Sequence, residues 1–90
     1  MKRIFKYNLE QKELQIVQIP RGGEILCVQV QNCVPCIWAL IDEDNPLANI
    51  YIEIYPTGEI ILSSNNRKYI GTYQLHGGIL VYHCFERLLN

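Results

Sequence analysis

The sequence predicts a small all-β domain in which about eight short antiparallel strands form a barrel or a sandwich. Apolar and polar residues alternate along most of the chain, as they do in half-buried strands. Clusters of Gly, Pro, Asn and Asp separate the alternating runs, and no stretch has the apolar spacing of a long helix. Ninety residues, 49% of them hydrophobic, suffice for one core, so residues 1–90 are expected to be a single β-domain.

Eight runs rich in Ile, Val and Tyr are the expected strands. The clearest is IYIEIY, in which the isoleucines fall on one face and the tyrosines on the other. The connections are too short for the crossovers that parallel strands need, so neighbours in sequence are expected to pair antiparallel, as a meander. The expected strands are Ile4–Tyr7, Leu14–Ile19, Ile25–Gln31, Cys36–Ile41, Ile50–Tyr55, Glu59–Leu62, Tyr69–Leu75 and Gly78–Phe85.

The last two strands carry further detail. Gly71 interrupts the run KYIGTYQL, where a glycine is typical of a bulge or a sharp corner. The final run, GGILVYHCFE, is apolar on both faces and is therefore expected to be covered on both sides. One cover is the core, and the other is either the C-terminal FERLLN or a second subunit. Phe85, Leu88 and Leu89 have helical spacing, which predicts a short helical turn at the C-terminus.

The stretch QNCVPCIW is expected to be a hairpin turn rather than a metal or redox site. Asn32 and Cys33 would form a two-residue turn, after which Val34, Cys36 and Trp38 share one face of a strand. Cys36 then serves as a small apolar residue. A core position for Trp38 would make its truncation to alanine costly, whereas a ligand-binding role would leave folding intact.

Other chemistry finds weak support. The pair Cys33 and Cys36 has zinc-ligand spacing but no second pair, and adjacent strand residues such as His83 and Cys84 point to opposite faces. A thiol redox centre lacks the helix that lowers the first cysteine's pKa. His76 and Cys84 could meet across the last hairpin, but no third member of a triad is evident. The acidic turn DEDNP lacks calcium-loop spacing. We therefore expect no enzyme activity, no catalytic residues, no metal and no cofactor.

Charge and hydropathy bear on nucleic-acid binding, membrane contact and cellular compartment. The formal net charge is −1, which gives no electrostatic reason to expect nucleic-acid binding. No apolar run is long enough to cross a membrane, and the N-terminal MKRIFKYNLEQKEL does not resemble a signal peptide. A cytoplasmic protein without membrane contact is therefore expected, in which the four cysteines are free thiols or metal ligands.

A binding surface can be outlined from basic and aromatic residues. Small β-domains hold anionic ligands with arginine side chains that lie beside exposed amides and aromatic rings. Outward-facing tyrosines are typical of protein interfaces, and they predict a homo-oligomer. The turns IPRGGEIL and YPTGEIIL are similar, and would form one rim if they lay at the same end of a barrel. The candidate ligand- or partner-binding residues are Arg21, Tyr51, Tyr55, Thr57, Arg67, Lys68 and Tyr69.

Four stretches, IPRGGEILCVQVQN, IWALIDEDNPL, YIEIYPTG and RKYIGTYQLHGGILVYHCFE, carry a resemblance to a known family. Together they resemble a family of short proteins found in bacteriophages and prophages, a domain of unknown function. In that family a glycine is commoner where Cys33 and Pro56 stand, which implies that Cys33 is not a shared metal ligand. The family has no assigned catalytic residues, so the resemblance supplies context and no mechanism.

That context implies a non-enzymatic phage accessory protein in the host bacterial cytoplasm. The leading expectation is an inhibitor of a host antiviral defence system that binds a host defence protein or sequesters a small anionic signalling nucleotide. A minor structural or assembly protein of the virion is the first alternative. A small zinc- or thiol-dependent enzyme is the second.

Overall fold

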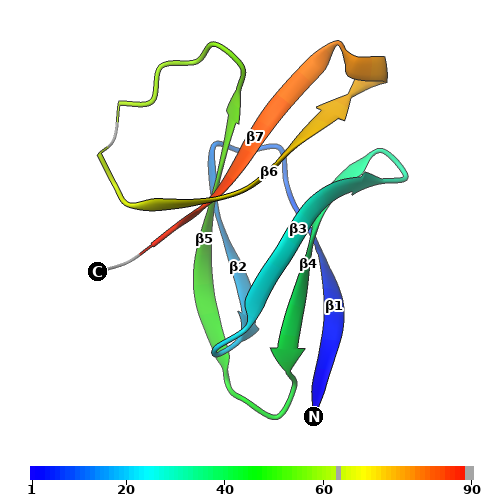
Figure 1. The fold of residues 1–90 in the computed structure, drawn as a ribbon, viewed down its shortest axis with the longest axis vertical. Helices are drawn as coiled ribbons and strands as arrows, with labels where there is room; N and C mark the ends of the chain where they lie inside the picture. Colours follow the sequence, from blue (N-terminus) through cyan, green and yellow to red (C-terminus); the bar gives the residue numbers. More distant parts are fainter. Residues whose placement is uncertain (63, 89–90) are drawn as a thin grey trace.

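A computed structural model, which describes residues 1–62 and 64–88, contains seven strands in two antiparallel sheets (Figure 1). A three-stranded sheet has the order β1-β4-β3 and a four-stranded sheet the order β2-β5-β7-β6. The all-β prediction is confirmed. The strands are β1 (Lys2–Asn8), β2 (Leu14–Pro20), β3 (Glu24–Gln31), β4 (Val34–Asp42), β5 (Leu47–Pro56), β6 (Arg67–Leu75) and β7 (Leu80–Arg87).

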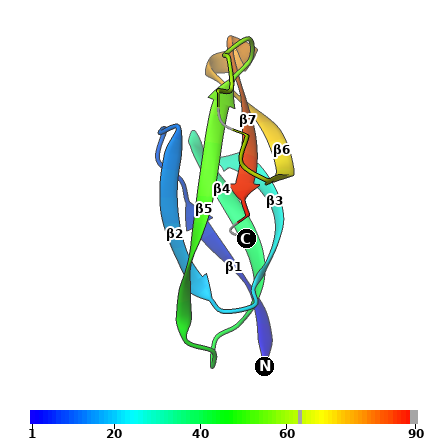
Figure 2. The ribbon, with the colours of Figure 1, turned by 90° about the vertical axis from the view of Figure 1, so that its left-hand side faces the viewer.

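The two sheets form a sandwich, and the expected meander is wrong. Only two pairs of consecutive strands, β3 with β4 and β6 with β7, are hydrogen-bonded neighbours. The short connections 9–13, 21–23 and 43–46 instead carry the chain from one sheet to the other. A short connection thus sets the strands antiparallel without deciding whether they share a sheet. The sandwich measures 39 × 32 × 16 Å and is narrow when seen from its side (Figure 2).

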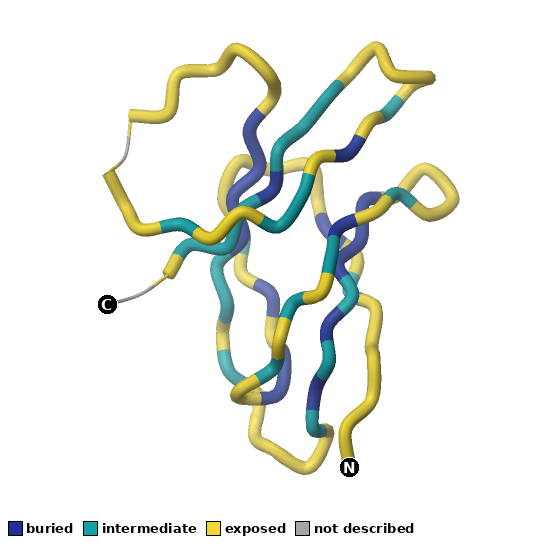
Figure 3. The backbone as a smooth tube through the Cα atoms, in the orientation of Figure 1, coloured by how far each residue is buried: buried dark blue, intermediate teal, exposed yellow. Residues whose placement is uncertain are grey.

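The core lies between the sheets, where alternate residues of the strands meet, with Tyr7 of β1 packed at its side. Figure 3 shows the buried segments running through the middle of the molecule, with exposed connections around them. The core contains aliphatic side chains with one tyrosine and one cysteine, as expected from the period-two pattern. Its buried members are Leu9, Val17, Ile19, Val28, Ile37, Ala39, Ile41, Ile52, Ile54, Tyr73 and Cys84.

Gly71 marks a bulge, as the sequence predicted. The register between β6 and β7 shifts between Tyr69 and Gly71. At this position β6 packs closely on β3, because a Cβ atom built on Gly71 would lie 2.9 Å from Cγ1 of Val28. Glycine is therefore required by close contact between the sheets, at the place where they approach.

The QNCVPCIW stretch is the hairpin turn between β3 and β4. Asn32 and Cys33 have φ angles of 51° and 66°, the left-handed conformation of a two-residue hairpin turn. Gln31 pairs with Val34 directly across it. Cys36 is buried on the outer face of the three-stranded sheet, and Trp38 is half-buried on that face, outside the core.

Two further expectations differ from the structure. The segment Glu59–Leu62, expected as a strand, has no strand partner among the described residues. The two similar turns lie at opposite ends of the sandwich, because Pro20 pairs with Leu47 whereas Leu14 pairs with Glu53, near the other end of β5. They therefore do not form one rim.

The C-terminal part contains little helix. A 3-10 turn at His76–Gly78 connects β6 to β7 and is the helical element of the described residues. Phe85 continues in β7, which ends at Arg87, and Leu88 is not helical. Residue 89, the last member of the predicted helical spacing, lies outside the described residues. Within residues 1–62 and 64–88, no helix has the length and apolarity needed to span a membrane.

Candidate binding surface on the four-stranded sheet

The outer face of the four-stranded sheet carries an unusual set of polar and aromatic side chains. In β5 the outward positions include Glu53 and Tyr55, because Ile52 and Ile54 between and beside them are in the core. Outward positions of β7 and β6 follow from the ladder, in which Phe85 opposes Glu53 and Tyr69 opposes Phe85. We call this surface the outer face. Its central residues are Glu53, Tyr55, Thr57, Arg67, Tyr69, Thr72, His83, Phe85 and Arg87.

Glu53 is a fully buried carboxylate held between two guanidinium groups. Arg67 donates from Nε to Oε1 at 2.5 Å, and Arg87 donates from Nε to Oε2. The hydroxyl of Tyr55 also donates to Oε1, at 2.7 Å. Burial alone would raise the pKa of Glu53, but these three donors outweigh it and hold the pKa below its ordinary value. The carboxylate is therefore ionised, and it connects β5 to the start of β6 and the end of β7.

Three aromatic rings pack beside this ion cluster. Phe85 lies between Tyr55 and Tyr69 in edge-to-face contacts, with ring centroids 6.3 Å and 5.5 Å apart. The guanidinium of Arg67 lies 5.9 Å from the ring centroid of Tyr55. Tyr55 is buried, whereas Tyr69 at the sheet edge is 57% exposed. Tyr69 is therefore the aromatic side chain best placed to touch a partner.

A chain of hydrogen bonds fixes the other side of the outer face. The Tyr69 hydroxyl lies 2.6 Å from Oγ1 of Thr72, which lies 3.0 Å from Nδ1 of His83. Nε2 of His83 is 2.7 Å from Oγ1 of Thr57. Both ring nitrogens thus contact threonine hydroxyls, which can donate or accept. Among the described residues, no carboxylate contacts His83, so this group lacks the acid of a catalytic triad.

Most of the candidate residues proposed from the sequence lie on this face. Tyr55, Thr57, Arg67 and Tyr69 are central to it, and Tyr51 lies beside them, opposite Arg87 in the ladder. Two others are separate from it. Arg21 is in the turn between β2 and β3, where its carbonyl accepts a hydrogen bond from Asn45. Lys68 pairs with Glu86, whose other neighbour is the buried Ile52, so Lys68 is on the opposite face of the sheet.

Sequence reasoning missed Glu53, Thr72, His83, Phe85 and Arg87. One signal was present: Glu53 occupies an outward position between two tyrosines of a strongly apolar strand, and a carboxylate there needs cationic partners if it is covered. Its partners come from β6 and β7, separated from it by 14 and 34 residues. The pairing of β5 with β7 was needed to place them.

The cysteines lie elsewhere. Cys33 is exposed in its turn, and Cys84 faces the core, where burial raises its pKa to about 12. His76 lies in the turn before β7, whereas Cys84 is opposite Gly71, well along the hairpin, so the two do not meet. In the part of the chain that the structure describes, no three His, Cys, Asp or Glu residues are grouped closely enough to hold a metal ion.

Comparison with known proteins identifies the family. The family model described as a domain of unknown function (DUF7352) matches residues 1–89. No curated protein and no solved structure shows a significant match. The match extends over both sheets and includes the whole outer face. The chain therefore belongs to the family of the domain of unknown function DUF7352.

Proposed function

We propose that this protein is a non-enzymatic binding module that uses the outer face to dock a protein partner. The observation that carries the proposal is the ion cluster around Glu53. A buried carboxylate fixes two guanidinium groups next to an exposed tyrosine, so the side chains of the surface are ordered before a partner arrives. Preorganisation lowers the entropy cost of association.

The composition of the outer face supports a protein partner. Tyrosine, phenylalanine and arginine are enriched at protein interfaces and at the residues that dominate binding energy. The guanidinium groups of Arg67 and Arg87 converge at the centre of the face, where that of Arg67 lies against the ring of Tyr55. We therefore propose a partner surface that presents a carboxylate next to an apolar side chain.

A nucleotide ligand is the second candidate, favoured by the arginines beside aromatic rings. Two features make it weaker. The rings of Tyr55, Phe85 and Tyr69 pack edge to face on one another, which leaves fewer free ring faces for a base. Small-molecule sites are usually concave and enclose most of the ligand, whereas this surface is the outer side of a sheet.

The resemblance to phage and prophage proteins suggests a biological setting. A small binding module expressed during infection would act by occluding a host protein, with no chemical step. We propose inhibition of a host antiviral defence protein in the bacterial cytoplasm. A virion assembly protein would use the same face for contacts with other virion subunits.

Replacing Tyr69 with alanine tests the proposal. Because this side chain is 57% exposed, Tyr69→Ala should leave the fold intact. The matched control is Ile79→Ala, which removes an apolar side chain that is 82% exposed in the turn before β7. Wild-type protein and both variants would be expressed in bacteria that carry individual defence systems, and the plating efficiency of a phage that each system restricts would be measured.

We expect wild type and Ile79→Ala to restore plating against one system, and Tyr69→Ala to lose that effect. The same defence protein should co-purify with wild type and with Ile79→Ala, but not with Tyr69→Ala. Native mass spectrometry of the purified protein checks the nucleotide alternative, because a bound nucleotide adds its mass. The proposal is wrong if a bound nucleotide accounts for the effect, if Tyr69→Ala acts like wild type, or if no system is inhibited.

A further inference from the structure

The segment Glu59–Leu62 has the sequence of a strand but pairs with no strand in the described part of the chain. Three large aliphatic side chains in a row are solvent-exposed: Ile60 at 77%, Ile61 at 41% and Leu62 at 94%. The amide of Glu59 closes a turn on the carbonyl of Pro56, 3.2 Å away. Within the described residues, the backbone groups of residues 60–62 make no hydrogen bond. Figures 1 and 3 show that the segment lies away from both sheets and that its residues are exposed.

Such a segment is costly to leave in water. Isoleucine favours strands because its branched side chain packs well on a pleated surface, and each exposed aliphatic side chain forgoes the free energy of burial. The same composition predicted the eighth strand of the fold. The segment therefore has the chemistry of a strand that pairs with an edge outside its own sheet order.

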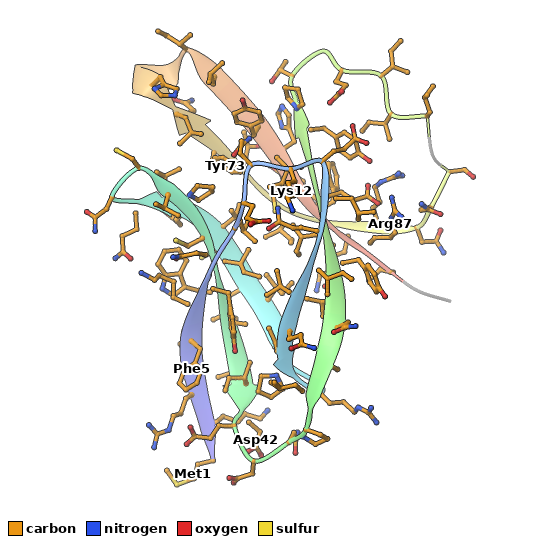
Figure 4. The ribbon with its side chains drawn as sticks, turned by 180° about the vertical axis from the view of Figure 1, so that it is seen from behind. Met1, Phe5, Lys12, Asp42, Tyr73 and Arg87 are labelled. Atoms are coloured by element: carbon orange, nitrogen blue, oxygen red, sulfur yellow. The ribbon has the colours of Figure 1, made fainter. Side chains whose placement is uncertain are left out.

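A receiving edge exists on the other side of the molecule. β1 pairs only with β4 and β2 only with β5, so in the described chain each has one side whose N–H and C=O groups meet no strand. The free sides of β1 and β2 face one cleft of about 650 Å³. Figure 4, the view from behind, shows β1 and β2 joined by their connection. The cleft is lined by Lys6, Tyr7, Asn8, Glu10, Gln15, Ile16, Val17 and Gln18.

The edge of β2 has apolar neighbours for both faces of an added strand. Leu14 and Ile16 are exposed on the outward side, whereas Val17 points into the core. In an extended segment, Ile61 points to one face and Ile60 and Leu62 to the other, so each face of the segment has an apolar side chain of β2 beside it.

The segment cannot reach this edge within its own chain. A strand added beside β2 would be four strand positions from β6, about 19 Å at the usual spacing. Only five peptide steps separate Leu62 from Arg67, at the start of β6, and they span at most about 18 Å when fully extended. A taut chain would also have to cross the sheet above the side chains of the outer face. We therefore expect an occupant of the β2 edge to come from a second molecule.

We propose that Glu59–Leu62 of one molecule adds as an edge strand to β2 of a second copy, so that the protein self-associates by strand addition. Backbone hydrogen bonds along β2 provide the pairing, and burial of the three aliphatic side chains provides the driving force. This proposal is independent of the partner proposed for the outer face.

Hydrogen exchange of the wild-type chain at several protein concentrations is the primary test. We expect the amides of residues 60–62 that point toward β2, and the β2 amides that point away from β5, to exchange more slowly as concentration rises, in step with the oligomer mass from native mass spectrometry. The proposal is overturned if the mass stays at 10.5 kDa at every concentration. It is also overturned if these amides exchange equally fast in an oligomer and a monomer.

Variants in the segment provide the second test. Ile61→Pro removes an N–H group that no described residue accepts, so folding should persist while the oligomer is lost. Leu62→Asp should also yield monomer, whereas its matched control Ile79→Asp, at an aliphatic residue 82% exposed elsewhere, should associate like wild type. Circular dichroism checks folding in each case. An oligomer that forms equally well in Ile61→Pro and Leu62→Asp contradicts strand addition.

Discussion

Substitution of Glu53 by glutamine is expected to destabilise the fold more than any other single change on the outer face. The glutamine is nearly the same size, so packing is preserved. Its amide, however, carries no charge to balance Arg67 and Arg87, and one of its two polar atoms is a donor facing other donors. The perturbation therefore isolates the ion cluster from the packing around it.

The magnitude follows from the burial of the three groups. Removing one partner of a buried ion pair costs about 3–5 kcal/mol, because the remaining charge is left without compensation. The side chain of Arg67 is 13% exposed and that of Arg87 is 25% exposed, so water can recover part of the loss. We expect a decrease of about 3 kcal/mol in the free energy of unfolding, near the lower end of that range.

The pH dependence gives the prediction a second signature. The folded-state pKa of Glu53 lies below the value in the unfolded chain, which is about 4.3. The unfolded chain therefore takes up the proton first as pH falls, and the stabilisation by Glu53 is lost between its unfolded and folded pKa values. The stability gap between wild type and Glu53→Gln should be full near neutral pH and should shrink below about pH 4.

Urea denaturation followed by tryptophan fluorescence measures both effects. Glu59→Gln is the control, because it neutralises an exposed glutamate whose side chain joins no ion pair among the described residues. The control should stay within about 0.5 kcal/mol of wild type. Two results would contradict the proposed role of Glu53 in holding Arg67 and Arg87: a cost of less than about 1 kcal/mol for Glu53→Gln at pH 7, or a stability gap that does not change with pH.

Three further predictions concern the sheets, and each is checked by urea denaturation. Ile37→Ala should cost about 2–5 kcal/mol, clearly more than Trp38→Ala, because Ile37 is fully buried whereas Trp38 is half-buried on the solvent side of the three-stranded sheet. The reverse order would contradict the assigned core. Gly71→Ala should cost about 1–3 kcal/mol, and Val28→Ala in the same chain should recover part of that loss; additive effects would mean that the two residues are not in contact. Cys33→Gly should raise stability by about 0.5–1 kcal/mol, since the turn requires a positive φ; a loss would contradict the turn geometry.

Local rules were sufficient to locate the seven strands of this fold. Alternation in IYIEIY located β5, and the turn chemistry of Asn32 and Cys33 located the hairpin between β3 and β4. Gly71 predicted its bulge. Each of these features is decided within a few residues, so the sequence near it contains the necessary information.

The strand order could not be predicted in the same way. A three-residue connection such as 21–23 can close a hairpin or cross between sheets, and the choice depends on which apolar faces the whole chain can bury together. The site depended on that choice. Glu53 meets Arg67 and Arg87 only because β5 pairs with β7 and β7 with β6. Sequence proximity therefore identified Arg67 and Tyr69 as candidates but missed the carboxylate that orders them.

The predicted strand at Glu59–Leu62 is absent for a different reason. Its composition predicts a strand, but a strand also needs an edge, and within the described part of the chain the segment pairs with none. The propensity and the structure agree if the edge belongs to a second copy.

Photo-crosslinking in bacterial cells tests the central claim most directly. A photoreactive phenylalanine analogue would replace Tyr69 on the outer face in one variant and Ile79, an exposed residue in the turn before β7, in another. If the outer face docks a protein partner, position 69 should give a discrete crosslinked product with a protein other than this chain, and position 79 should not. A product from position 79 alone, or none from position 69 while the protein inhibits a defence system, would contradict the account.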